Sequence, residues 1–180
     1  AATGNTSYGY FGGGYPGPVS TVDRVDYSND TATAVAKGPL SAVRRLFAAT
    51  GNASYGYWAS ADPEVSTIDR IDYANDLATA SPKGLLSFAK YKFGATGNTS
   101  YGYFAGGSGG GTKSSVDRID YANDSAIAVA KGPLSVARYH LAAASSRANG
   151  LIPYTLTIST PFAFGNNPTP DYPYGYFGGG

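Results

Sequence analysis

The sequence repeats itself at a spacing of about 47 residues, and this self-similarity constrains the fold more than any other feature. Asn5, Asn52 and Asn98 lie 47 and then 46 positions apart, which fixes the register of the copies. Three copies and a tail account for the chain: residues 1–47, 48–94, 95–142 and 143–180. The copies differ in length within one stretch rich in Gly, Pro and Ser, which is typical of a surface loop.

Each copy contains four runs that predict short β-strands. In the first copy these are residues 8–11, 22–27 and 31–36, and the run at 44–49 opens the next copy. Apolar and polar residues alternate in these runs, and Gly, Asn and Pro bound them, as expected for hairpins. The predicted fold class is therefore all-β, with three tandem four-stranded units that read as propeller blades, followed by a C-terminal strand-containing tail.

Composition excludes several function classes. The 13 Lys and Arg residues nearly balance the 12 Asp and Glu residues, so no basic surface for nucleic acid is expected. The chain has no cysteine, so it offers neither a disulfide framework nor a thiolate metal site. No run of about 18 apolar residues is present, and no membrane span is expected. No cofactor and no metal are predicted.

A recurring DRVDY-type motif supplies the main candidate for a charged site. Arg24 and Asp26 share one face of the predicted strand because side chains alternate in direction, while Asp23 points the other way. One interpretation is an oxygen-rich cation site that also uses Asn29 and Asp30 of the next turn. The interpretation favoured here is a structural ion-pair ladder between strands or units, with an Asx-type turn at Asn29 and Asp30, since an arginine repels a cation. The ladder comprises Arg24, Asp26, Arg70, Asp72, Arg118 and Asp120.

Two further recurring patterns have a structural and a functional interpretation. The Asn-x-Ser/Thr pattern would allow glycosylation in a secreted eukaryotic chain, whereas turn chemistry alone explains it otherwise. It occurs at Asn5, Asn29, Asn52, Asn98 and Asn123. The tyrosines of the SYGY motif, such as Tyr8 and Tyr10, offer either a sugar-stacking surface or packing between neighbouring units, and packing is favoured. Trp58 occupies the position of Phe11 and is also predicted to be core.

Catalytic chemistry has little support in the sequence. His140 is the single histidine, and it lies in a predicted strand without a Cys, His or Glu pattern around it. Lys37, Lys83 and Lys131 precede glycine, but no phosphate-binding loop motif is present. The chain is therefore predicted not to be an enzyme.

The order of the motifs resembles a kelch repeat. Arg44, a small-apolar strand, YGYFGGG, VDRIDY, a four-residue turn and Gly-Pro-Leu follow one another, and the resemblance covers residues 1 to about 141. Kelch repeats carry a Gly pair after the second strand, a Tyr-Asp-type turn after the third and a Pro near the end. Ala and Thr stand here where an aromatic residue usually follows that turn. The resemblance implies kelch-like propeller blades.

Whole phrases are also similar to repeat segments in long structural proteins of tailed phages, notably those of cyanobacterial hosts. Written as composites of the copies, these phrases are GN[TA]SYGYFGGG, STVDRIDYANDTATA and KGPLS. The similarity implies a role in a virion or its tail fibre, with no catalytic activity, and an extracellular or virion location.

The tail repeats one phrase of the copies, because YGYFGGG returns at residues 174–180. Three blades do not close a propeller, which usually has four to eight. The partners expected are therefore further copies of the chain, as a homo-oligomer or filament, or further repeats of a longer chain. Tyr174, Tyr176 and Phe177 are the candidate assembly strand, added to a neighbouring subunit.

Two functions follow from these observations. The first is a structural repeat protein of a virion tail, fibre or extracellular filament, which assembles through its blades and C-terminal strand. The alternative is a lectin-like or host-surface binding module for a cell-surface glycan. Its contact surface would be the loops at residues 12–21, 59–67 and 105–115.

Overall fold

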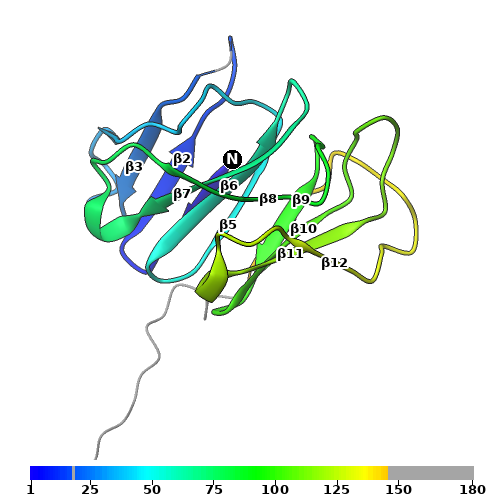
Figure 1. Ribbon diagram of the computed structural model, residues 1–180. Helices are drawn as coiled ribbons and strands as arrows, with labels where there is room; N and C mark the ends of the chain where they lie inside the picture. The colour runs from blue at the N-terminus through cyan, green and yellow to red at the C-terminus, as the bar shows by residue number, and fades with distance from the viewer. Residues whose placement is uncertain (18, 146–180) are drawn as a thin grey trace, which may run out of the picture.

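The computed structural model describes residues 1–17 and 19–145, which form three four-stranded antiparallel sheets (Figure 1). The first comprises β1 (Ala2–Gly4), β2 (Tyr8–Gly12), β3 (Val22–Asp26) and β4 (Val35–Lys37). The second comprises β5 (Ala48–Gly51), β6 (Tyr55–Ala61), β7 (Val65–Asp72) and β8 (Ser81–Leu85). The third comprises β9 (Gly94–Gly97), β10 (Tyr101–Ala105), β11 (Val116–Asp120) and β12 (Val129–Lys131). The prediction of an all-β chain with four strands in each repeat is confirmed for this part of the sequence.

Each sheet is a meander, because strands that are neighbours in sequence are hydrogen-bonded neighbours in space. Two short 3-10 helices interrupt the strands, η1 (Tyr73–Asn75) after β7 and η2 (Tyr121–Asn123) after β11. No α-helix occurs in the described ranges, so none there is long and apolar enough to cross a membrane.

An asparagine closes the first hairpin of every sheet. The Oδ1 atom of Asn5 accepts hydrogen bonds from the backbone N–H groups two and three residues later, both at 2.9 Å. Asn52 and Asn98 repeat this arrangement. A Cβ atom at Gly4 would lie 2.3 Å from the carbonyl oxygen of Tyr8, so the residue before the asparagine must be small. The Thr-Gly-Asn phrase is thus a turn signal with a steric cause.

Two predicted strands need corrected boundaries. Residues 31–36 are predicted to be strand, but the turn after β3 runs to Ala32, residues 33–34 are irregular and β4 begins only at Val35. Residues 44–49 were also expected to be strand, and β5 begins only at Ala48. Leu46 adopts a left-handed φ of 55°, which departs from the extended backbone of a regular strand. Its counterpart His140, with a φ of 57°, lies in a bend and not in a strand.

The cores lie between neighbouring sheets. Between the first and second sheets, Tyr10, Val22 and Leu40 pack against Trp58, Ile71 and Ala80. Between the second and third sheets, the buried cluster includes Tyr57, Ala59, Ile68, Phe104, Ile119 and Tyr121. The first strands of the sheets also lie side by side, β1 against β5 and β5 against β9. The first sheet therefore buries one face against the second, and the second buries its other face against the third.

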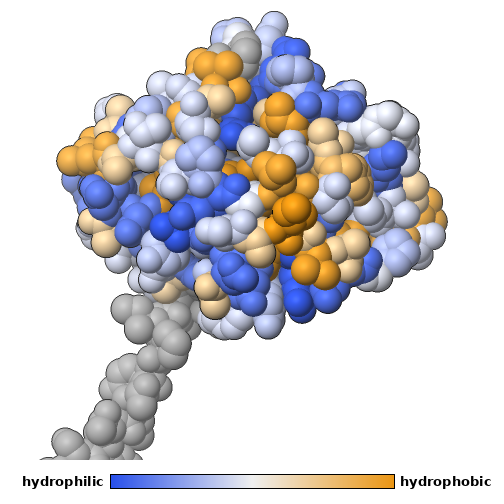
Figure 2. Space-filling view, in the orientation of Figure 1, coloured by the Kyte–Doolittle hydropathy of each residue, from blue (hydrophilic) through white to orange (hydrophobic). Residues whose placement is uncertain are grey.

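Exposed apolar side chains gather near the last strands of the second and third sheets. Figure 2 shows hydrophobic residues grouped on the visible face around β8, β11 and β12. Leu85 of β8, Val129 of β12 and Ile127 just before β12 are 41%, 51% and 65% exposed. Edge strands with apolar side chains are open to pairing with other chains.

Candidate functional site: the repeated junction between sheets

A carboxylate from the turn after β7 is the centre of the junction between the first two sheets. Asp76, only 7% exposed, accepts a hydrogen bond from the Tyr10 hydroxyl at 2.9 Å. The Arg24 guanidinium lies 2.7 Å from the same carboxylate oxygen, and the Lys37 ammonium lies 3.2 Å from the other. All three donors come from the first sheet, on β2, β3 and β4. One acidic side chain of the second sheet therefore binds three strands of the first sheet.

The same arrangement joins the second sheet to the third. Asp124 accepts a hydrogen bond from the Tyr57 hydroxyl at 3.0 Å and pairs with Arg70 at 2.7 Å. Lys83 completes the set at 3.8 Å. Tyr10 and Tyr57, Arg24 and Arg70, and Lys37 and Lys83 are equivalent positions of the repeat, as are Asp76 and Asp124. The junction is therefore a property of the repeat and not of one place in the chain.

Stacked tyrosines accompany each carboxylate. The ring of Tyr10 stacks on that of Tyr73, with ring centres 4.7 Å apart and planes inclined by 15°. Tyr57 stacks on Tyr121 in the same way, at 4.8 Å and 14°. The hydroxyl of Tyr121 lies 3.1 Å from the Thr50 hydroxyl of the second sheet. These pairs add specific aromatic contacts to the apolar surface that the sheets bury.

Within each sheet, the arginine of the junction is held in position by a tyrosine of the neighbouring strand. The guanidinium of Arg24 lies 4.2 Å from the ring centre of Tyr8, and Arg70 lies 4.4 Å from that of Tyr55. Stacking of this kind orients the planar guanidinium toward the next sheet.

A second buried ion pair crosses each junction. Between the first two sheets, Arg44 lies 3.1 Å from Asp69, whose carboxylate also accepts hydrogen bonds from the Ser41 backbone N–H and hydroxyl. Between the second and third, Lys90 lies 3.1 Å from Asp117, and its ammonium donates to the Phe104 carbonyl at 2.9 Å. Lysine replaces the planar fork of arginine with a single ammonium, so the second pair has fewer direct bonds.

The electrostatics of the junction follow from burial and from these partners. Burial, together with the neighbouring Asp76 carboxylate, raises the pKa of Tyr10 well above its usual 10.0. Burial alone would raise the pKa of Asp76, but hydrogen bonds from Tyr10 and Lys37 and the charge of Arg24 outweigh it and bring the pKa below 3.8. The carboxylate is therefore ionised and the phenol neutral across the physiological pH range.

Buried Lys90 shows the opposite balance. Burial lowers the pKa of its ammonium below the usual 10.5, and the charge of Asp117 and the hydrogen bond to it oppose this shift only in part. The pair is held by a structure that excludes water from both partners, since each is fully buried.

The predicted ion-pair ladder is corrected in its acidic members. Arg24 and Arg70 do pair with carboxylates, but these belong to the next sheet and are not Asp26 and Asp72. The acidic residues of the motif instead accept backbone N–H groups that open the turn after the third strand, as Asp72 does from Ala74 at 2.9 Å. Asp26 and Asp120 act in the same way, and Arg118 has no ion-pair partner within residues 1–17 and 19–145.

Other predicted residues also find their places. Tyr10 and Trp58 are fully buried between sheets, as expected for packing residues, whereas Phe11 is 53% exposed. Asn29 lies in the turn region after β3, where it accepts a hydrogen bond from the Thr31 hydroxyl at 3.3 Å, and Asn123 is the last residue of η2. No group of three His, Asp or Glu side chains that could hold a metal ion occurs in the described part of the chain. Tyr174, Tyr176 and Phe177 lie outside the described residues.

Two of the three predicted contact loops differ from each other in structure. Residues 59–67 are not a loop, because β6 and β7 extend almost to a short turn and Ala59 and Ala61 are buried. Near the loop at 12–21, a surface hollow of about 450 Å³ is lined by Gly14, Tyr15, Arg45 and Leu46. The Tyr15 ring is 76% exposed at this hollow.

Sequence reasoning missed the acidic centre of the junction. Asp76 and Asp124 belong to the Asn-Asp turn, for which the sequence suggests a cation site or an Asx-type turn but no contact with the preceding copy. The available signal was the joint recurrence of Tyr, Arg, Lys and Asp at matching positions of all copies. Two comparisons with known proteins add no identity: no family model matches the chain, and no curated protein matches it.

Proposed function

We propose that this chain is a structural repeat protein whose sheets act as propeller-type blades in a virion tail, fibre or extracellular filament. The observation that carries the proposal is the use of the repeated polar residues. Tyr, Arg, Lys and Asp side chains that would serve a binding or catalytic site are engaged across the two junctions, where they hold one sheet to the next.

The geometry of the sheets supports the blade interpretation. Every sheet is a four-stranded meander, each packs face to face on the next, and the first strands β1, β5 and β9 lie together. These are features of propeller blades arranged around an axis. The kelch-like order of motifs and the phage-like phrases agree with this assignment.

Electron microscopy of the purified 180-residue chain tests the proposal. Filaments or multi-chain rings are expected, because a scaffold must extend beyond one chain. Dispersed particles of monomer size at micromolar concentration would contradict it.

A second candidate is a glycan-binding module, and the hollow beside Tyr15 favours it. An exposed aromatic ring next to Arg45, whose guanidinium lies 6.0 Å from the ring centre, is a surface on which a sugar can stack. A saccharide array with the wild-type chain and the Tyr15→Ala variant separates the two functions. Binding that the substitution abolishes would favour the module, and a pure scaffold gives no signal.

A further inference from the structure

The two ends of the described array each carry half of a junction. The outward side of the third sheet, here called the tail face, holds Tyr103, Arg118, Lys131, Gly132 and Arg138. These are the counterparts of Tyr10, Arg24, Lys37, Gly38 and Arg44. The outward side of the first sheet, here called the head face, holds Phe11, Asp23, Tyr27, Asp30 and Ala32. These are the counterparts of Trp58, Asp69, Tyr73, Asp76 and Ala78.

The head face exposes side chains that are buried in the interior junctions. Phe11 and Tyr27 are 53% and 54% exposed, although the equivalent Trp58 is fully buried. Asp23 and Asp30 are exposed, and neither has an ion-pair partner among the residues that the structure describes. Two aromatic rings beside two unpaired carboxylates form a surface that matches the acceptor side of a junction.

The tail face shows the complementary half. Lys131 and Arg138 are exposed, and they too have no ion-pair partner in residues 1–17 and 19–145. Arg118 lies 4.3 Å from the ring centre of Tyr101, the same position that Arg24 takes when it binds Asp76. Arg118 thus has the position that its counterpart takes in an ion pair. The three cations of the tail face match in charge the two carboxylates of the head face.

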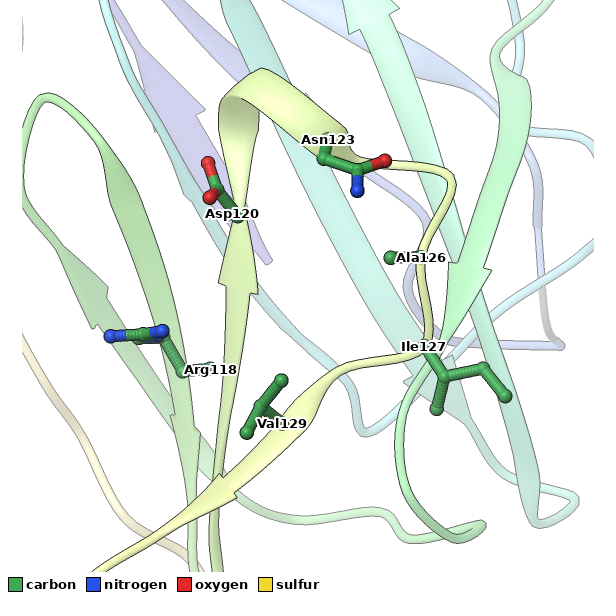
Figure 3. A pocket seen from close by; sticks show the side chains of 6 residues that line it. All are labelled: Arg118, Asp120, Asn123, Ala126, Ile127 and Val129. Atoms are coloured by element: carbon green, nitrogen blue, oxygen red, sulfur yellow. The ribbon is translucent and has the colours of Figure 1, made fainter.

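A shallow hollow of about 160 Å³ borders Arg118 on this side of the molecule (Figure 3). Figure 3 shows Arg118 and Asp120 on β11 and Val129 on β12, with Ala126 and Ile127 on the segment between them. In the interior sheets the equivalent arginines are covered by the turn of the next sheet. The third sheet leaves this place open.

The backbone carries the most direct sign of a missing partner. The Gly38 N–H donates to the Asp76 carbonyl at 2.8 Å, and a Cβ atom at Gly38 would lie 2.0 Å from the carbonyl oxygen of Ala78. Gly84 makes the same close approach to the third sheet. Gly132 occupies the equivalent position, yet a Cβ atom there would have no neighbour within 4 Å.

We propose that the tail face of one molecule docks on the head face of a second copy of this chain and forms a third junction. Asp30 of one copy accepts a hydrogen bond from the Tyr103 hydroxyl of the other and forms ion pairs with its Arg118 and Lys131. Asp23 forms an ion pair with Arg138 of that other copy. The occupant follows from continuity with the two interior junctions, whose acceptor residues the head face reproduces. The inference rests on the proposed scaffold function and identifies its contact surface. A head-to-tail contact of this kind either closes into a ring or continues as a filament.

Two variants of the full chain block one face each. Gly132→Ala adds a methyl group where the isolated molecule has open space, but where the docked carbonyl would lie about as close as at Gly38. Asp30→Lys places a cation opposite Arg118 and Lys131. Glu64→Lys makes the same charge change at an exposed position in the turn between β6 and β7, outside the residues that define either face, and is the control.

Sedimentation velocity over a concentration series measures the result. Wild type and Glu64→Lys are expected to self-associate, and each blocked variant should weaken self-association at least about tenfold. A mixture of the two blocked variants should form one-to-one dimers, because Gly132→Ala keeps a working head face and Asp30→Lys keeps a working tail face.

The outcomes separate the inference from the function on which it rests. If wild type assembles and both blocked variants assemble equally well, assembly uses another surface. That result overturns the inference and leaves the scaffold proposal standing. A monomeric wild type overturns both. Monomeric wild type with association after removal of residues 146–180 would assign the faces to the chain's own C-terminal segment, which also overturns docking by a second copy.

Discussion

Removal of the Asp76 carboxylate should weaken the junction between the first and second sheets. In Asp76→Ala, the buried Tyr10 hydroxyl loses its acceptor, and two cations that are largely shielded from water lose their counter-charge. The side chains of Arg24 and Lys37 are 23% and 10% exposed, so solvent replaces the carboxylate only in part. Breaking a buried pair by removing one partner costs roughly 3–5 kcal/mol. Partial solvation of Arg24 places the expected loss of unfolding free energy at about 3 kcal/mol.

Urea denaturation followed by tryptophan fluorescence measures this loss directly. Trp58 is the single tryptophan and is fully buried in the cluster between the first two sheets, so its emission reports on this junction. With a denaturant slope of about 2 kcal/mol per molar urea, a loss of about 3 kcal/mol lowers the midpoint by roughly 1.5 M.

The repeat supplies a matched control for this substitution. Asp30→Ala removes the same side chain from the same turn of the first sheet, where no ion-pair partner is present among the described residues. At protein concentrations below those at which chains associate, its free energy of unfolding should match that of wild type within about 0.5 kcal/mol. Equal effects of Asp76→Ala and Asp30→Ala would refute the assignment of Asp76 as the centre of the junction.

Three further predictions follow from the same geometry. Because the folded pKa of Asp76 lies below 3.8, the stability that its ionised carboxylate adds is present above that pH and is lost as the pH falls through the folded pKa. Urea midpoints measured from pH 6 to pH 2 should therefore fall more steeply for wild type than for Asp76→Asn. Parallel curves for the two proteins would contradict this. Gly84→Ala should cost at least about 2 kcal/mol in urea unfolding, because its Cβ would meet a carbonyl oxygen at 1.9 Å, whereas Gly132→Ala should be silent in the monomer. Phe104→Ala should lower the thermal stability by about 3–5 kcal/mol, against less than about 1 kcal/mol for Phe11→Ala; similar losses would show that the exposure of Phe11 is wrongly assigned.

The fold was predictable to the level of strands because local signals agree with one another. The Thr-Gly-Asn turn, the alternation of VDRVDY and the register of the repeat together indicate four strands in each copy. Strand ends were less predictable. Apolar residues at 44–49 resemble a strand, but the left-handed backbone of Leu46 depends on the junction that its segment crosses and leaves no mark in the local pattern.

The sequence predicted that the candidate site would contain ion pairs, but it did not predict which residues pair. An arginine that alternates with aspartates on one strand indicates an ion pair, and strand geometry points to Asp26 as the nearest partner. The actual partner of Arg24 comes from the turn of the next repeat, 52 positions away in sequence. Contacts of that range depend on how the sheets pack, which residue spacing within one copy does not specify.

Comparison of the repeats with one another distinguishes surface from interface. The loops between the second and third strands differ in length and content among the copies, as expected where few contacts constrain them. The tail face nevertheless keeps Tyr103, Arg118, Lys131 and Gly132 unchanged from the first copy. The Phe11 and Tyr27 side chains on the head face are exposed to water, and among the described residues Asp23 and Asp30 have no cation such as their counterparts bind. The two ends thus keep the residue types of the junction while the loops vary, and this contrast is the reason for proposing that a second copy docks there.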